Sequence, residues 1–309
     1  MMEPVLLDTD PGIDDAAAIA VAINDPHIDL QLITTVAGNV TVDKTTRNAL
    51  NLVSFFKAGI PVAAGAEQPL IKPFEDAARI HGESGMGDYV FPKYDHKPIP
   101  QTAVEALYTT LKNSPVPMTL IPTGSYTNIA LLLAEHPDVK PKIKRIIAMG
   151  GALHGGNMTS AAEFNVFTDP EAAEIMYQSG LPIVMVGLDV TMKALLTDET
   201  LAQLGQMGPA GVMLQKLFTH YYQGHEGGIP VHDVNTLAYL LHPEFYTTHP
   251  YWIDIQLNGP AVGATIADIR GAYHGEKTNA NVCETIDAPA FNAWFLREVA
   301  QMQTNLEQH

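Results

Sequence analysis

Near its start the chain has the run Asp8-Thr9-Asp10-Pro11-Gly12-Ile13-Asp14-Asp15, in which four aspartates fall within eight residues. The apolar segment Val5–Leu7 precedes this run and is typical of a buried strand, and the stretch Ala16–Ile23 after it has helical periodicity. Pro11 and Gly12 bend the chain between the two. The run is therefore predicted to be a strand-to-helix turn, which is the repeating unit of an α/β fold.

Four carboxylates this close repel one another, and a bound cation is the simplest way to neutralise them. Oxygen ligands without cysteine or paired histidine indicate a hard ion, Ca²⁺ or Mg²⁺. Helix capping by Asp14 or Asp15 is the alternative, but it explains only one or two of the acids. An EF-hand loop counted from Asp8 would need glycine where Ile13 stands. A haloacid-dehalogenase phosphatase would need Thr or Val where Gly12 stands.

Composition limits the classes of function. The chain has 309 residues, of which 46% are hydrophobic, and a formal net charge of −17. A surface this acidic repels nucleic acids and anionic membranes, so neither is an expected partner. The only cysteine, Cys283, excludes an internal disulfide and is expected to be a small buried residue in a strand. There is no signal-peptide pattern and no apolar run near the ~20 residues of a membrane span, so a cytoplasmic location is expected.

Apolar runs alternate with helical periodicity over the first two thirds of the chain. Strands are expected at Val5–Leu7, Leu30–Val36, Pro61–Ala64, Met118–Pro122, Arg145–Met149 and Pro182–Gly187. Helices are expected at Asp15–Ile23, Lys44–Phe56, Thr102–Lys112, Asn128–Glu135 and Pro170–Gln178. This alternation predicts an open, mostly parallel (mixed) sheet with helices on both faces, Rossmann-like in class.

The last third has a different order of elements. Helices are expected at Asp198–Leu204, Gly211–Tyr222 and Val234–Leu241, followed by strands at Tyr251–Leu257, Gly263–Ile269 and Ala280–Ile286 and a terminal helix at Pro289–Gln301. No linker, repeat or low-complexity segment separates this part from the rest. We therefore expect a single domain over residues 1–309, with the C-terminal third packed on the sheet.

Polar residues follow the predicted strands at the point where each strand ends. They are Asp8 to Asp15, Gly38-Asn39, Thr123-Gly124, Gly150-Gly151 and Asp189. Open α/β sheets bind ligands at the carboxyl ends of their strands, so we expect the active site there. Two long polar loops, Gly65 to Pro100 and Gly150 to Asn165, interrupt the pattern, and loops of this length inside a domain are usually functional.

Seven segments together resemble the inosine–uridine preferring nucleoside hydrolase family. They are the opening run, Thr34-Thr35-Val36-Ala37-Gly38-Asn39, His81-Gly82-Glu83-Ser84-Gly85, Thr123-Gly124, Met149-Gly150-Gly151, Ala162-Glu163-Phe164-Asn165 and His232-Asp233. The resemblance runs in order through nearly the whole chain and is strongest to the bacterial non-specific ribonucleoside hydrolases. It implies an open α/β fold, a tightly bound Ca²⁺, hydrolysis of the N-glycosidic bond of ribonucleosides to ribose and free base, and a homotetramer or dimer.

The resemblance also implies roles for individual residues. The calcium ligands would be Asp10, both oxygens of Asp15, the carbonyl of Thr123, and Asp233. Asp14 would hydrogen-bond the ribose 2′-hydroxyl. The remaining substrate contacts would come from Asn39, Asn157, Glu163, Phe164 and Asn165, with Met149 beneath the sugar, His81 lining the base pocket and His232 on the side of the leaving base. Asp8 would orient Asn39 or a ligand.

The chemistry of the reaction agrees with these roles. Cleaving an N-glycosidic bond develops positive charge on the ribose in an oxocarbenium-like transition state, which a carboxylate-rich pocket stabilises. Calcium is a modest Lewis acid, so we expect Asp10 to activate the metal-bound water as general base. His232 titrates near neutral pH and is the candidate acid for the leaving base.

The base preference stays open at this stage. The segment from Phe218 to Pro230 contains His220, Tyr221, Tyr222 and His225, to which no single roles can be assigned. Tyr222 is a candidate for stacking on the base or relaying a proton, with packing as the alternative. Three other functions remain: a hydrolase restricted to pyrimidines, a non-catalytic ribose or nucleoside binder, and a phosphohydrolase with Asp8 as nucleophile, which would want a nearby lysine.

Overall fold

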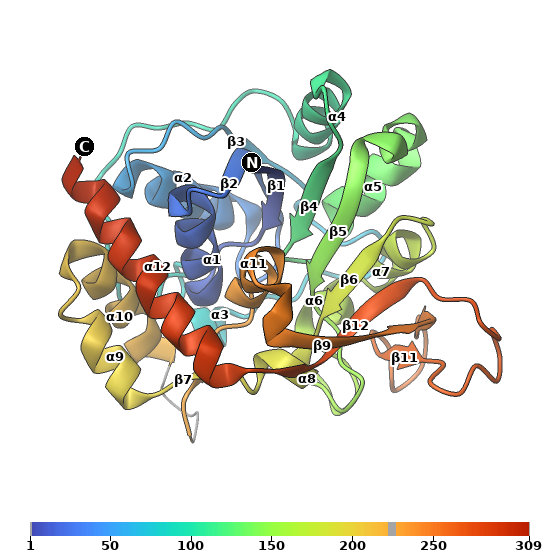
Figure 1. Ribbon diagram of the computed structural model, residues 1–309. Coiled ribbons are helices and arrows are strands. Elements are labelled where there is room, and N and C mark those ends of the chain that lie inside the picture. Colours follow the sequence, from blue (N-terminus) through green and yellow to red (C-terminus); the bar gives the residue numbers. More distant parts are fainter. Residues whose placement is uncertain (1, 222–226, 309) are drawn as a thin grey trace.

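The computed structural model describes residues 2–221 and 227–308. Its centre is an eight-stranded sheet with the strand order β3-β2-β1-β4-β5-β6-β12-β9 (Figure 1). The strands are β1 (Glu3–Thr9), β2 (Ile28–Thr35), β3 (Val62–Ala64), β4 (Met118–Pro122), β5 (Ile143–Met149), β6 (Ile183–Val186), β9 (Tyr246–Tyr251) and β12 (Ala280–Ile286). Seven of them run parallel, and only β9, at one edge, pairs antiparallel with its neighbour β12.

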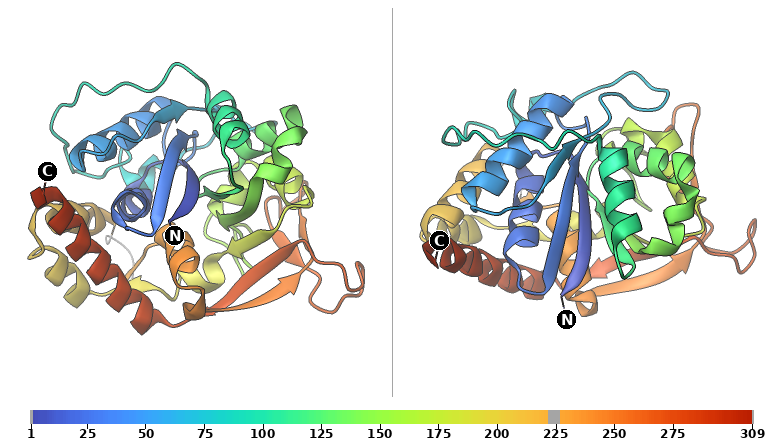
Figure 2. Two further views of the ribbon diagram at one scale, coloured as in Figure 1. Left: turned by 45° about the horizontal axis from the view of Figure 1, so that its top comes forward. Right: turned by 90° about the horizontal axis from the view of Figure 1, so that it is seen from above.

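Helices cover both faces of this sheet (Figure 2). One face packs against α1 (Ile13–Asn24), α2 (Val42–Phe55), α9 (Asp198–Leu204), α10 (Gly208–Tyr221), α11 (Val234–Leu241) and α12 (Ala288–Gln308). The other packs against α4 (Ala103–Asn113), α5 (Thr127–Glu135), the 3₁₀ helix η1 (Pro137–Lys142) and α7 (Pro170–Tyr177).

The alternation of side chains along β1 explains the two layers. Val5 and Leu7 belong to the hydrophobic core of the first face, whereas Leu6 between them belongs to the core of the second. Successive residues of a strand point to opposite faces, so a strand with helices on both sides is apolar throughout. This is why Val5–Leu7 is a continuous apolar run.

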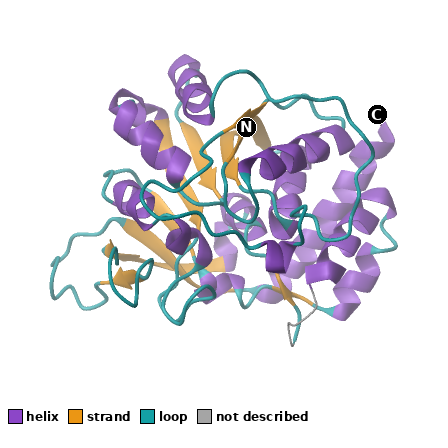
Figure 3. Ribbon diagram, turned by 180° about the vertical axis from the view of Figure 1, so that it is seen from behind, coloured by secondary structure: helices purple, strands orange, loops and turns teal. Residues whose placement is uncertain are grey.

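The remaining elements are short and lie in the connections. They are α3 (Ala78–His81), α6 (Phe164–Thr168), α8 (Leu188–Thr191), η2 (Pro243–Phe245) and two small antiparallel sheets, β7 (Leu195–Leu196) with β8 (Ile229–Pro230) and β10 (Ile253–Ile255) with β11 (Thr265–Ala267). Figure 3 shows long loops running over the near side of the helix-enclosed sheet. The predicted loops Gly65 to Pro100 and Gly150 to Asn165 contain the helices α3 and the start of α6, which the sequence did not predict.

The predicted fold class is confirmed, and the bounds predicted for β4, α9, α11 and β12 match those of the structure. The last third differs from the prediction. Strands β12 and β9 extend the main sheet beyond β6 instead of packing on it. The predicted strand Tyr251–Leu257 is divided between the end of β9 and β10, and the terminal helix continues to Gln308. Tyr222, predicted as the last residue of a helix, lies outside the described residues.

Two expectations from composition can also be compared with the structure. None of the helices in residues 2–221 and 227–308 is long and apolar enough to cross a membrane. Cys283 is fully buried in β12, as expected, and this burial raises the pKa of its thiol.

Candidate active site at the carboxyl edge of the sheet

A cavity of about 200 Å³ opens at the carboxyl ends of the parallel strands. Its walls include most of the residues predicted from the sequence: Asp14, Asn39, His81, Thr123, Met149, Asn157, Glu163, Phe164, Asn165, His232 and Asp233. Asp8, Asp10 and Asp15 are buried outside this lining. The predicted contact Tyr222, like His225, lies outside the described residues.

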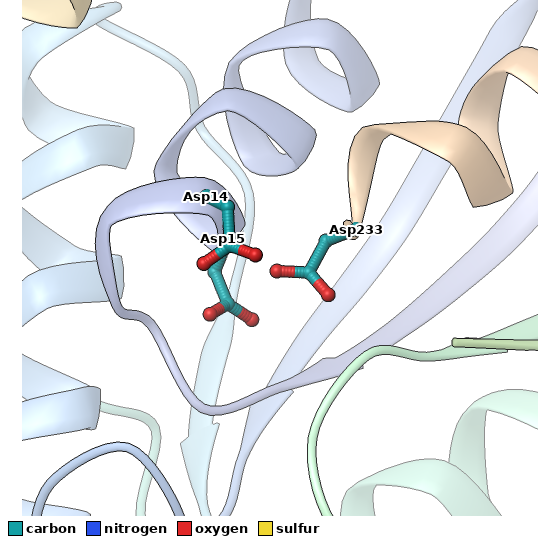
Figure 4. A group of neighbouring side chains, drawn as sticks. All are labelled: Asp14, Asp15 and Asp233. Carbon is teal, nitrogen blue, oxygen red and sulfur yellow. The ribbon is translucent and has the colours of Figure 1, made fainter. Parts of the chain in front are cut away.

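An acidic cluster forms one side of the cavity. Carboxylate oxygens of Asp14, Asp15 and Asp233 all lie within 4.8 Å of one another, and all three side chains are buried. Figure 4 shows Asp14 and Asp15 entering from the first turn of α1, and Asp233 facing them from the start of α11. The buried polar residues of the described chain include no lysine or arginine. Among the described residues, no buried lysine or arginine is therefore available to balance these acids.

Burial and mutual repulsion change the protonation of this cluster. Burial, followed by the charge of Asp15, raises the pKa of Asp14 to about 7. Burial and then the charge of Asp14 raise the pKa of Asp233 well above its usual range, and a hydrogen bond joins the two side chains. Like charges at this separation raise each other's pKa, so a bound cation would favour the ionised form of both carboxyls.

Asp10 lies in a slot between Gly38 and Gly124. Its Oδ2 accepts a hydrogen bond from the backbone N–H of Asn39 at 2.7 Å, whereas its buried Oδ1 has no partner among the described residues. A Cβ on Gly38 would lie 2.0 Å from Oδ2, and one on Gly124 would lie 2.9 Å from Oδ1. Burial and the charge of Asp15 raise the pKa of this carboxyl. Only glycine at 38 and 124 lets the backbone approach Asp10 this closely.

Asp15 is held by four donors of the protein. Its Oδ1 accepts hydrogen bonds from the hydroxyls of Thr9 at 2.6 Å and Thr123 at 3.0 Å. Its Oδ2 accepts from the backbone N–H of Gly12 at 3.0 Å and the side-chain amide of Asn39 at 2.9 Å. A carboxylate has about four acceptor directions, so these bonds fix its orientation.

Asp8 makes contacts other than those predicted. Its Oδ1 accepts from the hydroxyl of Thr34 at 2.5 Å and the amide of Asn128 at 2.8 Å, while Asn39 is bound by Asp10 and Asp15 instead. The expectation that Asp8 orients Asn39 is therefore wrong. Asp8 lies on the same face of β1 as Leu6, which packs with α5, and its partner Asn128 is a residue of α5.

Glu163 organises the wall opposite the acidic cluster. It caps α6, and its carboxylate accepts from the backbone N–H groups of Asn165 at 2.9 Å, Val166 at 3.2 Å and Gly151 at 2.9 Å. Burial nevertheless raises its pKa to about 7. Asn165 in turn donates to the carbonyl of Thr123 at 2.8 Å and to that of Met149 at 3.2 Å.

Two histidines line the cavity. His81 accepts a hydrogen bond at Nδ1 from the backbone N–H of Ile13 at 3.1 Å, and its ring lies 5.4 Å from the ring of Tyr221. Burial, followed by the positive charge that His232 would have, lowers the pKa of His81 to about 3, so this ring is neutral. The Nδ1 of His232 lies 2.8 Å from the hydroxyl of Thr191.

The cavity also includes residues that the sequence did not identify, namely Ala77, Arg79, Ile80, Met158 and Met192, together with Tyr221, to which no role was assigned. Arg79, Ile80 and Met158 are neighbours of His81 and Asn157, which is the only signal that pointed to them. Met192 had none. Conversely, Asp189 follows β6 as predicted but does not line the cavity; it accepts a hydrogen bond from Leu153 N–H at 2.7 Å and holds the segment 150–165.

Comparison with known proteins agrees with this geometry. The family model of the inosine-uridine preferring nucleoside hydrolases matches residues 5–293. The non-specific ribonucleoside hydrolase RihC of Klebsiella pneumoniae is 46% identical over 302 residues, covering 97% of this chain and 99% of the relative. The same enzyme of Shigella sonnei is 47% identical over 302 residues, again covering 97% and 99%.

Solved structures of this family share the fold. A purine-preferring ribonucleoside hydrolase from Gardnerella vaginalis superposes with a TM-score of 0.92 at 32% identity, covering 97% of this chain and 99% of the other. The plant nucleoside hydrolase PpNRh1 gives 0.92 at 30% identity with the same coverage. The chain therefore belongs to the inosine-uridine preferring nucleoside hydrolase family and is an enzyme that acts on N-glycosyl bonds.

Proposed function

We propose that this enzyme hydrolyses ribonucleosides to ribose and free base in a Ca²⁺-dependent reaction, and that it accepts both purines and pyrimidines. The observation that supports this most is the buried cluster of Asp14, Asp15 and Asp233. It lies at a cavity whose other polar side chains are of types that hydrogen-bond to sugar hydroxyls. The relatives named non-specific ribonucleoside hydrolases support the mixed base preference.

The residues present fit a calcium ion. All candidate donors are oxygens, no buried lysine or arginine competes among the described residues, and Oδ1 of Asp10 is a buried acceptor without a partner. Asp10, Asp15, the carbonyl of Thr123 and Asp233 would hold the ion. When bound, calcium supplies Lewis-acid polarisation and neutralises the buried acids, which are otherwise partly protonated.

The chain's own residues perform the remaining steps. Asp14, whose carboxylate is ionised once the cluster is neutralised, accepts a hydrogen bond from the ribose 2′-hydroxyl. Asn39, Asn157, Glu163 and Asn165 bind the other hydroxyls, and Met149 and Phe164 pack against the sugar and exclude water. Holding the sugar in this way lowers the activation free energy, because the contacts are stronger in the transition state, where the ribose ring is flattened.

Bond cleavage needs a base and an acid on opposite sides of the ribose. Asp10 accepts the proton of the attacking water at Oδ1, a role typically worth ~10²–10⁴-fold in rate. The surrounding carboxylates stabilise the positive charge that develops on the ribose. His232 donates a proton or hydrogen bond to the departing base, and the Thr191 hydroxyl beside Nδ1 fixes its ring.

The test is ribose release from inosine, adenosine, uridine and cytidine, measured with a reducing-sugar assay before and after metal stripping. Calcium-dependent release from all four supports the proposal. Release from uridine and cytidine alone would identify a pyrimidine-restricted hydrolase. Tight binding by calorimetry without turnover would identify a nucleoside-binding protein, and both outcomes would refute the function proposed.

We also propose that residues 1–309 form one domain and that four copies assemble into a homotetramer. The continuous main sheet, which joins β3 near the start to β12 near the end, supports the single domain. A single cooperative unfolding transition and a mass of four chains by light scattering are the expected results. Two separate transitions, or a monomer, would contradict these two proposals respectively.

A further inference from the structure

One buried side chain of α2 connects two segments of the site that are far apart in sequence. Asn48 is 4% exposed, and its Nδ2 donates to the carbonyl of Pro11 at 2.9 Å and to the carbonyl of Ser84 at 2.8 Å. The first carbonyl belongs to the run Asp8–Asp15, here called the aspartate turn, and the second belongs to the segment His81–Gly85. Both hydrogens of a single amide are therefore used to hold these two segments together.

The packing around this amide leaves room for little else. Gly85 has a φ of +83°, and a Cβ there would lie 2.8 Å from Nδ2 of Asn48 and 3.2 Å from the carbonyl oxygen of Pro11. Two carbonyl oxygens that face one buried amide need a double donor without negative charge. Among side chains of this size only asparagine supplies that, since aspartate has no donor and leucine has no polar atom.

A second hydrogen bond between the same two segments lies beside Asn48. The backbone N–H of Ile13 donates to Nδ1 of His81 at 3.1 Å. A backbone N–H is always a donor, so Nδ1 bears no hydrogen, and the neutral ring must bear its hydrogen on Nε2. The ring lines the cavity, and among the described residues no hydrogen bond to its Nε2 is formed. His81 therefore presents an N–H donor to the cavity.

We propose that Asn48 is a positioning residue for the leaving base: by holding the aspartate turn against the segment His81–Gly85, it preserves the Ile13–His81 hydrogen bond and so keeps Nε2–H of His81 directed at an acceptor atom of the nucleobase. This inference rests on the proposed function and adds to it a residue that does not touch substrate. The two segments that Asn48 joins are far apart in sequence, since 68 residues separate Ile13 from His81.

The test is a cycle of Asn48→Ala, His81→Ala and the double variant, each assayed on inosine and on p-nitrophenyl riboside. Asn48→Ala should lower kcat/KM for inosine about tenfold, the effect of losing one well-placed hydrogen bond. It should change p-nitrophenyl riboside less than about threefold, because that leaving group departs without help from the protein. The double variant should lose no more on inosine than His81→Ala alone.

Asn51→Ala is the matched control. It removes the same side chain about one turn along α2, where the described part of the chain forms no hydrogen bond to it, and should leave both activities unchanged. If Asn48→Ala does not fold, Asn48→Ser, which retains one neutral hydroxyl donor, replaces it, with thermal unfolding and calcium content recorded for every variant.

The other outcomes are decisive. Equal losses on both substrates, or losses that multiply in the double variant, would mean that Asn48 has a purely structural role, and wild-type activity on inosine would also overturn the inference. If the wild-type enzyme releases no ribose from any nucleoside, the proposed function itself fails, which is distinguishable from the failure of this inference alone.

Discussion

Gly38→Ala tests whether the position of Asp10 controls the reaction. A Cβ at this position would lie 2.0 Å from Oδ2 of Asp10, whereas real Cβ contacts are essentially never shorter than 3.0 Å. The carboxylate or the glycine loop must therefore move by at least about 1 Å, the difference between these distances. Oδ2 is also the acceptor for the N–H of Asn39, so that hydrogen bond is strained at the same time.

A displacement of about 1 Å in a catalytic group costs on the order of 10²-fold in rate. Overpacking of a buried site costs about 1–3 kcal/mol of the free energy of unfolding. We therefore expect Gly38→Ala to lower kcat for inosine about 100-fold in the reducing-sugar assay, and to lower the free energy of unfolding in urea by about 1–3 kcal/mol.

Two further glycine-to-alanine variants of the same enzyme serve as controls. Gly59→Ala places its Cβ in open space and should leave both kcat and stability near wild type. Gly124→Ala approaches Oδ1 of Asp10 at 2.9 Å, needs a much smaller shift, and should have an intermediate effect. A folded Gly38→Ala enzyme with kcat within threefold of wild type would refute the reasoning, because Asp10 would then tolerate displacement.

Three other perturbations have defined outcomes. Chelation of calcium should abolish ribose release and lower the midpoint of thermal unfolding. Calcium at ~1,000 times Kd should raise the free energy of unfolding again by about 4 kcal/mol. A midpoint that chelation leaves unchanged would contradict the metal proposal. His232→Ala should reduce inosine hydrolysis by ~10²–10⁴-fold but p-nitrophenyl riboside hydrolysis far less, and equal losses would make His232 a binding residue. The third concerns Glu298, whose pKa is raised to about 7 by burial and by Asp25. Ionising it costs stability as pH rises from about 4.5 to 7, so Glu298→Gln should stabilise the fold at pH 8 by about 1 kcal/mol, after allowance for solvent screening, with no gain below pH 4.5. A gain that is equal at both pH values would exclude this titration as its cause.

The parallel half of the fold could be predicted because its strands are recognisable locally. Strand β4 has the predicted bounds Met118–Pro122: it is an apolar run ended by a proline and followed by glycine. The position of β12 in the sheet could not be predicted. Residues 280–286 read as a strand, but insertion between β6 and β9 depends on contacts with segments about 100 and 35 residues away, which no local pattern encodes.

The residues of the candidate active site were also predictable only in part. Glu163 and Asn165 were predicted through the family resemblance of the segment Ala162-Glu163-Phe164-Asn165, because taken singly each would have been assigned to turn chemistry. Met192 was not, because a methionine after a strand is normally a core residue, and its 46% exposure at the cavity results from the path of the chain through α8. Sequence reasoning found the residues of the recognised motifs and missed Ala77, Arg79, Ile80, Met158 and Met192, which belong to the cavity by location alone.

The four aspartates of the opening run illustrate why a cluster in sequence is not yet a cluster in space. Asp8 still belongs to β1, where its Oδ1 accepts hydrogen bonds from Thr34 and Asn128, and Asp10 enters the slot between two glycines. Only after the chain turns into α1 do Asp14 and Asp15 approach Asp233, which comes from the other end of the chain. The carboxylates therefore differ in their partners: Oδ1 of Asp8 accepts hydrogen bonds from two neutral donors of the protein, whereas Asp14 and Asp233 lie against each other, where burial and mutual charge raise the pKa of both. Neutral donors occupy both oxygens of Asp15, whereas Oδ1 of Asp10 has no partner among the described residues and Asp14 and Asp233 face each other in the wall of the cavity. The repulsion within the run is therefore least compensated around the proposed position of the cation.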